Sequence, residues 1–112
     1  MVTIHGDIDH DSVRRLTPLA RETLESCQYR VVFDLSDCPY LDSSGIGLFL
    51  GLLFDVAKTE WIGVVGANEA LCRVFDLTGL SSQDRFHSWT DLDELRRFLE
   101  EKESSRPTLR ES

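Results

Sequence analysis

The sequence has few cysteines, and none of them is placed for a metal site or a disulfide framework. The three cysteines are odd in number and widely spaced, with no C-x-x-C pair and no histidine at metal-ligand spacing. We expect each to be a small core residue or an incidental thiol. The three histidines are equally scattered and form no ligand or acid–base set. These residues are Cys27, Cys38, Cys72, His5, His10 and His87.

Basic residues are also scarce, because 12 Lys and Arg stand against 20 Asp and Glu and leave a formal net charge of −8. Nucleic-acid phosphates and anionic membrane surfaces repel such a chain, so we expect no direct nucleic-acid or membrane partner. The N-terminus lacks the basic stretch, apolar segment and cleavage site of a secretory signal, which predicts a cytoplasmic protein. The most apolar segment, 46–58, is shorter than the roughly 18 residues of a membrane span.

Strand and helix patterns alternate along the 112 residues, which suit one domain with one packed core. Such an order predicts a mainly parallel sheet with helices packed against it. Period-2 alternation and short apolar runs predict the strands, and apolar residues at helical spacing predict the helices. We expect strands at 2–8, 30–35, 61–65 and 86–89, and helices at 13–27, 46–58, 68–77 and from the cap Asp91 to about residue 101.

The chain departs from these regular patterns at two places. Pro18 lies inside the first helical pattern, where a proline removes a backbone donor and clashes with the preceding turn. We expect it either to kink the helix or to move its start to about Thr17. Residues from Lys102 onward lack apolar periodicity, which predicts a domain over 1–102 and a disordered tail over 103–112.

The most informative segment is 31–53, where a buried strand leads through Asp42-Ser43-Ser44-Gly45 into an unusually apolar helix. This segment resembles the STAS domain family and, within it, the bacterial anti-sigma factor antagonists. Their motif is an aspartate, a phosphorylatable serine, a second serine or threonine and a glycine, entered from a strand and followed by an apolar helix.

Three further segments extend the resemblance over nearly the whole domain. In order, they match the Gly-x-x-Asp after the early strand, the central strand and the end of the late helix. The resemblance implies a single α/β STAS-like domain, with a mainly parallel sheet of four to five strands and about four helices. Members usually carry another strand before the first one here, so the leading edge strand is expected to be shortened or missing. The matching segments are Gly6-Asp7-Ile8-Asp9, Val32-Phe33-Asp34-Leu35-Ser36 and residues 74–80.

For function, the resemblance implies a regulatory protein that is not an enzyme and carries no cofactor. The implied partner is an anti-sigma factor serine kinase, which binds the unmodified protein, is thereby kept from its sigma factor, and releases the antagonist after phosphorylating it. A serine phosphatase would reset the cycle, and the chain would act as a monomer or weak dimer. By position, Ser43 matches the phosphorylated serine, Ser44 its neighbour, Asp42 the preceding acid, and Asp9 the acid near the phosphorylation site.

The motif also has a physical interpretation of its own. Ser43 and Ser44 lie where a strand ends and a helix begins, so one is expected to cap the helix while the other points its hydroxyl outward. Gly45 and Gly47 leave the backbone open to close approach. A phosphate on Ser43 would add a charge of about −1.5 to −2 beside Asp42 and would change a docking surface strongly.

The helix after the motif has hardly any polar face. Such a helix must be fully buried or must present apolar side chains to a partner, and full burial is difficult in a small domain. We therefore expect its part near Ser43 and Gly47 to bind the partner. The expected partner-binding residues are Asp9, Asp42, Ser43, Ser44, Gly45, Gly47 and Leu48, and the other apolar side chains considered for exposure are Phe49, Leu52 and Phe54.

Two other functions stay open at this point. The alternatives to the antagonist are an unphosphorylated STAS scaffold subunit of a sensory assembly and a STAS sensor that binds a nucleotide or another small molecule. A serine hydrolase fits poorly, because the residues before Ser43 lack the first glycine of a nucleophile elbow.

Overall fold

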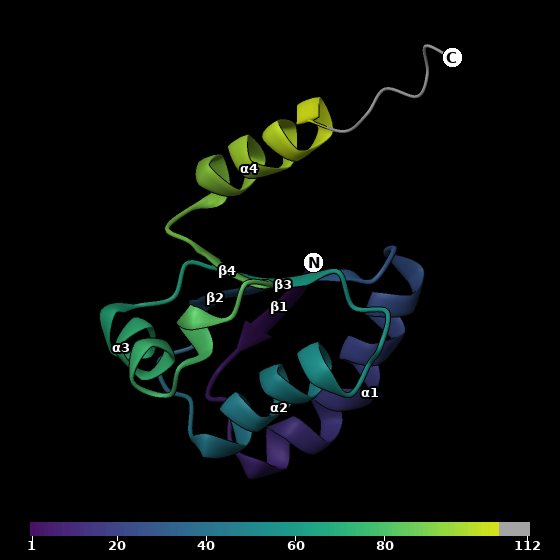
Figure 1. Ribbon diagram of the computed structural model, residues 1–112. Helices are drawn as coiled ribbons and strands as arrows, with labels where there is room; N and C mark the ends of the chain where they lie inside the picture. Colours follow the sequence, from purple (N-terminus) through teal and green to yellow (C-terminus); the bar gives the residue numbers. More distant parts are fainter. Residues whose placement is uncertain (106–112) are drawn as a thin grey trace.

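The computed structural model describes residues 1–105 and folds them into strands and helices that alternate along the chain (Figure 1). A short 3₁₀-helix, Leu80–Ser82, is the one departure from this alternation within the described residues. The elements are β1 (Val2–His5), α1 (His10–Ser26), β2 (Arg30–Asp37), α2 (Ser43–Phe54), β3 (Trp61–Val65), α3 (Glu69–Leu77), β4 (Phe86–Trp89) and α4 (Leu92–Ser105).

The four strands form one sheet in the order β1-β2-β3-β4, and every neighbouring pair is parallel. Each crossover therefore moves one strand along in the same direction, and right-handed crossovers place their helices on a common face. Figure 1 shows this arrangement, with α1, α2 and α3 below the sheet and α4 above it. The predicted α/β domain with a parallel sheet and four helices is confirmed for residues 1–105.

The main core lies between the sheet and the three helices below it. Its centre is a group of phenylalanine rings in edge-on contact: Phe49 of α2 lies 5.1 Å from Phe33 of β2 and 6.1 Å from Phe75 of α3, measured between ring centroids. Phe86 of β4 lies 5.4 Å from Phe75. Rings packed in this geometry add attraction beyond the area they bury, so α2 and α3 are held against the sheet from several directions.

The upper face of the sheet carries a smaller aromatic cluster beneath α4. The rings of Trp61 on β3 and Trp89 on β4 meet edge-on over Gly63, with 5.9 Å between their centroids, and Phe98 of α4 packs onto both. Gly63 makes this possible, because a Cβ there would lie 2.2 Å from a ring carbon of Trp89. One face of the sheet thus carries aliphatic and phenylalanine side chains, and the other carries two indoles in edge-on contact.

The first strand is shorter than predicted, because β1 ends at His5 and not at Ile8. The register against β2 shifts between Thr3 and His5, and Gly6 follows with a φ of +99°. Glycine adopts this left-handed conformation at little steric cost, so the chain turns there. After this turn, Ile8 forms an isolated parallel bridge with Leu41.

The first helix begins earlier than predicted and continues through its proline. Asp9 caps α1 by accepting the Ser12 N–H at 3.0 Å, and the Ser12 hydroxyl lies 2.8 Å from the Asp9 N–H, which completes a capping box. This start lies eight residues before Pro18, which is exposed within the helix. The expected start at Thr17 was wrong because the capping box begins the helix independently of the proline.

Two other helix ends also differ from prediction. α2 runs over Ser43–Phe54 instead of 46–58, because Arg85 ends it by donating to the carbonyl oxygens of Leu53, at 2.7 Å, and Thr59, at 2.8 Å. α4 extends to Ser105, beyond the predicted boundary at Lys102. The remaining residues of the predicted tail, 106–112, lie outside the described residues.

Candidate functional site

The isolated bridge between Ile8 and Leu41 pairs the two segments that lead into α1 and α2. The Ile8 N–H donates to the Tyr40 carbonyl at 3.0 Å, and the Asp42 N–H donates to the Ile8 carbonyl at 3.1 Å. The next residue on each side, Asp9 and Asp42, is the N-cap of its helix. The N-termini of the two helices therefore begin from adjacent stretches of backbone, and each is capped by an aspartate.

Both capping carboxylates already accept hydrogen bonds from the helices they begin. Asp42 accepts the Ser44 N–H at 2.8 Å, and Asp9 accepts that of Ser12 at 3.0 Å. The Ser12 N–H, reinforced by the Ser12 hydroxyl and by Arg15, lowers the pKa of Asp9 despite an opposing effect of desolvation. The expectation that a serine of the motif caps α2 is wrong, because Asp42 takes that role.

The two serines are thereby left in the first turn of α2 with their side chains uncommitted. Ser43 is exposed and Ser44 is half-buried. Within residues 1–105, neither hydroxyl has a hydrogen-bond partner. The Ser43 hydroxyl can therefore be modified by another protein without the loss of a hydrogen bond that stabilises the fold.

The two glycines after the serines have different surroundings. Gly45 is buried, and a Cβ there would lie 2.7 Å from Cγ of Leu41 and 3.0 Å from Cγ2 of Ile8. Gly47 is exposed, and a Cβ there would meet nothing within 4 Å. Gly45 thus allows α2 to pack closely on the Ile8–Leu41 bridge, while Gly47 alone leaves open backbone at the surface.

The apolar side chains of α2 are almost all inside the protein. Leu48 is 6% exposed, Phe49 0% and Leu52 1%, whereas Phe54 is 57% exposed and lies beneath the Arg85 guanidinium, 5.8 Å from its ring centroid. Of the four apolar side chains considered for exposure, only Phe54 reaches the surface, so the domain buries more of the helix than expected. α2 is covered on one side by the sheet and on the other by α1, so only its polar and glycine positions reach the surface near the motif.

A groove of about 350 Å³ runs between α1 and α2, starting at the motif. His10 and Ser44 lie at its first end, and Arg21 and Asp55 lie at the other, so the two helices run in the same direction along it. The sequence predicted Asp9, the N-cap of α1, but not the residues of α1 that line the groove. The groove is lined by His10, Val13, Thr17 and Arg21 from α1 and by Ser44, Gly47, Leu48, Gly51, Leu52 and Asp55 from α2.

The structure brings most of the predicted partner-binding residues to one end of the domain. Asp9, Asp42 and Ser43 stand at the paired helix N-termini, with Ser44 and Gly47 along the adjoining groove. Gly45 and Leu48 belong to the same turn and are buried beneath this surface.

The cysteines and histidines of the described residues form no metal site, because no group of three or more His, Cys, Asp or Glu side chains converges there. Cys38 is buried, and this burial raises its pKa. Cys72 is half-buried and Cys27 is exposed. Among residues 1–105, no helix combines the length and the apolar composition that crossing a membrane requires.

Comparison with known proteins agrees with the fold. A family model described as "Mlab, STAS domain" matches residues 1–87. The chain belongs to the STAS domain family. The matched residues include β1, the Asp42–Gly45 segment, both helix N-termini and both walls of the groove.

Similar proteins are named anti-sigma factor antagonists. An anti-sigma-B factor antagonist of Staphylococcus epidermidis is 27% identical over 93 residues, which cover 82% of this chain and 86% of the relative. The fold also matches that of a Thermotoga maritima protein described as a candidate anti-sigma factor antagonist, with a TM-score of 0.71, 19% identity and coverage of 83% and 80% of the two chains.

Two structures of the anti-sigma factor antagonist SpoIIAA are similar as well. The unphosphorylated form has a TM-score of 0.61 at 18% identity, with coverage of 88% of this chain and 86% of SpoIIAA. The phosphorylated form of this protein, from Bacillus, has a TM-score of 0.58 at 20% identity, with coverage of 86% of each chain. At these identities the structures support the STAS fold of this chain.

Proposed function

We propose that this STAS domain is an anti-sigma factor antagonist that acts in the cytoplasm, binds an anti-sigma factor with serine kinase activity and is switched off by phosphorylation of Ser43. The observation that carries the proposal is the exposed, uncommitted Ser43 hydroxyl at the first turn of α2, beside two capped helix N-termini. In this cycle the chain is the substrate of the kinase, and a serine phosphatase restores the binding form.

The electrostatic surroundings of Ser43 favour a switch that turns binding off. A phosphate carries about −1.5 to −2 charge, and a helix N-terminus is normally a favourable place for it. Here the capping positions of both nearby N-termini are already occupied by Asp9 and Asp42. The phosphate would therefore add to two carboxylates, and a partner covering this surface would have to desolvate all three anionic groups.

The effect on binding would be large. Burying an ionised group without sufficient compensation costs several kcal/mol, and each 1.4 kcal/mol changes a dissociation constant about tenfold. The fold itself would tolerate the phosphate, because Ser43 is exposed and its hydroxyl bonds to nothing within residues 1–105. Modification of Ser43 thus acts on the binding surface and leaves the core unchanged.

The similar proteins support the same proposal. The relative from Staphylococcus epidermidis is named an anti-sigma-B factor antagonist, and the SpoIIAA structures represent an unphosphorylated and a phosphorylated form. These names connect the STAS fold with anti-sigma factor binding and with phosphorylation, which are the two activities assigned here to the surface around Ser43.

The test is affinity capture from the native host with four baits: wild type, Ser43→Ala, Ser43→Asp and the control Ser81→Asp. Ser81 is exposed on the 3₁₀-helix, so its substitution adds the same charge outside the motif. We expect wild type, Ser43→Ala and Ser81→Asp to capture a histidine-kinase-like ATPase and Ser43→Asp to lose it. Mass spectrometry should find phosphate on Ser43 of wild type.

Two results would contradict the proposal. If all four baits capture the same proteins and Ser43 stays unmodified, the domain is a constitutive scaffold and Ser43 is only the first residue of a helix. If no ATPase is captured by any bait and equilibrium dialysis detects a bound nucleotide, the domain is a small-molecule sensor.

A further inference from the structure

The two walls of the groove between α1 and α2 have the same spacing. The lining residues of α1 stand at positions i, i+3, i+7 and i+11 from His10, and those of α2 include the same steps from Ser44 through Gly47 and Gly51 to Asp55. At a rise of 1.5 Å per residue, each wall spans about 16 Å, or three helical turns. Two parallel ridges at this spacing form the kind of surface into which the side chains of a third helix interdigitate.

The glycines in this groove are not required by the fold. A Cβ on Gly47 would meet no atom within 4 Å, and one on Gly51 would meet only a carboxylate oxygen of Asp55, at 3.4 Å. Glycine within a helix is less favourable than alanine, so both positions lower the stability of the isolated protein. Gly45 differs, because the core fills the space beside it. The space beside Gly47 and Gly51 is therefore available to another molecule.

The first end of the groove, which we call its mouth, is acidic. Its lining residues there, His10 and Ser44, follow the helix N-caps Asp9 and Asp42 by one and two residues, and the exposed Asp7 and Asp11 flank Asp9 in the chain. Arg15 acts on Asp9 but leaves the acidic residues in the majority. A protein segment that covers the mouth has to bring basic side chains to it.

Resting on the proposed function, we propose that the groove receives an amphipathic helix of the anti-sigma factor, about three turns long, that runs antiparallel to α1 and α2. Lysine and arginine are most favourable in the last turn of a helix, where they oppose the negative end of its dipole. A helix with a basic last turn therefore fits the groove with its C-terminus at the mouth and its N-terminus near Arg21 and Asp55. Its small or apolar side chains pack over Gly47 and Gly51.

This arrangement also explains the position of the switch. Ser43 directly precedes Ser44, which lines the mouth. A phosphate on Ser43 occupies the space that the last turn of the partner helix needs. It also adds a third anionic group to Asp9 and Asp42, whereas the basic side chains of the partner helix balance only those two carboxylates. The same helix that gives affinity is therefore the element that phosphorylation displaces.

Titration calorimetry with the anti-sigma factor identified by the capture experiment tests the groove. We expect Gly47→Leu and Gly51→Leu to weaken binding at least about tenfold. The control Ala70→Leu, at an exposed helical position on α3, should bind within about twofold of wild type. Gly47→Ala should raise the melting temperature of the free protein while weakening binding, a combination that a purely structural role for glycine does not produce.

The charge at the mouth is tested by Asp9→Asn and Asp42→Asn. Asparagine caps helices about as well as aspartate, so these variants keep the cap and remove only the charge. We expect weaker binding and a smaller loss of affinity between 50 and 500 mM NaCl than wild type shows. Unchanged affinity and unchanged salt dependence would contradict the proposal that the last turn of the partner helix is basic.

The direction of the helix is tested by placing the photoreactive residue p-benzoylphenylalanine at His10 or at Arg21, both exposed at opposite ends of the groove. We expect both cross-links within one helix of the anti-sigma factor, with the His10 site about 11 residues later in its sequence and next to Lys or Arg. Cross-links in the reverse order, in a strand or loop, or to a second copy of this chain overturn the proposal.

The two proposals fail in different ways. If no anti-sigma factor binds the wild-type protein, both are wrong. If one binds and responds to Ser43→Asp, but Gly47→Leu and Gly51→Leu bind as tightly as Ala70→Leu, the proposed function stands and the helix in the groove is wrong.

Discussion

Three helices cover one face of the parallel sheet, whereas α4 alone packs on the other (Figure 1). Within the described residues, 21 buried side chains form the core on the first face, and only Trp61, Val65, Trp89 and Leu95 are buried in the cluster on the second. Since hydrophobic stabilisation grows with the apolar area removed from water, most of the stability of this domain comes from the face that carries the motif.

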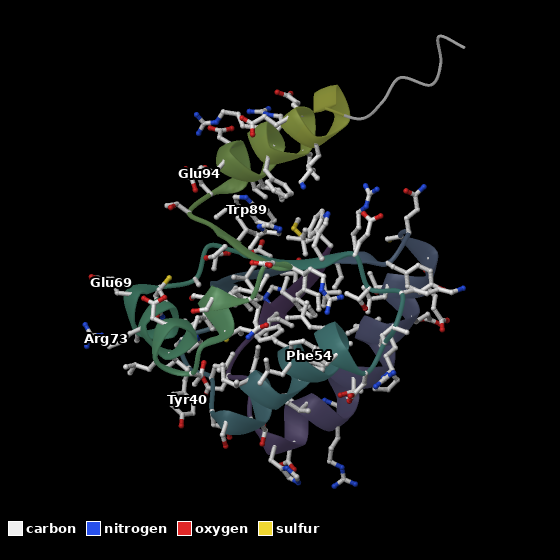
Figure 2. The ribbon with its side chains drawn as sticks, viewed as in Figure 1. Tyr40, Phe54, Glu69, Arg73, Trp89 and Glu94 are labelled. Atoms are coloured by element: carbon white, nitrogen blue, oxygen red, sulfur yellow. The ribbon has the colours of Figure 1, made fainter. Side chains whose placement is uncertain are left out.

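The difference between the faces separates stability from function in a useful way. Helices α1 and α2, which form the groove, rest on the larger core and therefore hold Ser43 and the two caps in a defined geometry. Figure 2 shows Trp89 on the upper side of the sheet beneath α4, with Phe54 of α2 on the lower side. Changes beneath α4 are therefore expected to alter stability and to leave partner binding unchanged.

The largest effect is expected for Phe49→Ala, on the first face. Phe49 is fully buried and lies within 6.2 Å of three other phenylalanine rings, measured between centroids. Removing it leaves a cavity among rigid neighbours, which costs about 3–5 kcal/mol of unfolding free energy. Urea denaturation followed by circular dichroism measures this loss.

The matched variant on the second face is Phe98→Ala. Phe98 is half-buried and packs on Trp61, His87 and Trp89, so a smaller loss of about 1–2 kcal/mol is expected. Equal losses for the two variants would mean that α4 contributes as much to the fold as the three helices below the sheet.

The architecture was predictable because it follows from the periodicity of apolar residues and from the order of strands and helices along the chain. Alternating strand and helix patterns allow few arrangements other than a parallel sheet with helices packed on it, and the motif placed the chain in its family. The ends of elements were less predictable because single contacts decide them. The capping box of Asp9 and Ser12 overrode Pro18, and Arg85 ended α2 four residues before the predicted end.

The residues of the candidate site could be proposed from the sequence, but their arrangement in space could not. Asp42 and Ser43 follow from the motif, and Asp9 from the family resemblance. The bridge between Ile8 and Leu41 that brings Asp9 and Asp42 together depends on residues 33 positions apart. The wall that α1 contributes to the groove has the same origin, because packing of α1 on α2 is a tertiary contact that no local pattern encodes.

A second comparison uses two glycines, one from each face. Gly63→Ala puts a Cβ 2.2 Å from the Trp89 ring and forces the indole to move, which is expected to cost about 1–3 kcal/mol. Near-ultraviolet circular dichroism should change, because Trp61 and Trp89 lose their packing. Gly47→Ala meets no neighbour and is expected to stabilise the free protein by about 0.5–1 kcal/mol. A neutral Gly63→Ala would mean that the indole cluster is loosely packed.

The smallest effect is expected from acid, and it arises on the second face. His87 packs against the rings of Trp89 and Phe98, at centroid distances of 5.9 Å and 4.7 Å. Desolvation by this packing lowers the pKa of His87, and the charge of Lys102 lowers it further. The folded protein therefore binds fewer protons at this site than the unfolded chain once the pH falls below about 6.5, the ordinary pKa of histidine.

The stability that neutral His87 contributes is consequently complete above pH 6.5 and is lost as the pH falls through the lowered pKa. His87→Gln removes the titration, so its unfolding free energy should fall less than that of wild type between pH 7.5 and 5.5. Asp9 and Asp34, whose pKa values are also lowered, titrate below about pH 4 and do not disturb this window. Urea denaturation followed by tryptophan fluorescence at both pH values measures the difference. Identical slopes for the two proteins would place His87 in a hydrated environment and would mean that α4 covers the upper face less tightly than its ring contacts require.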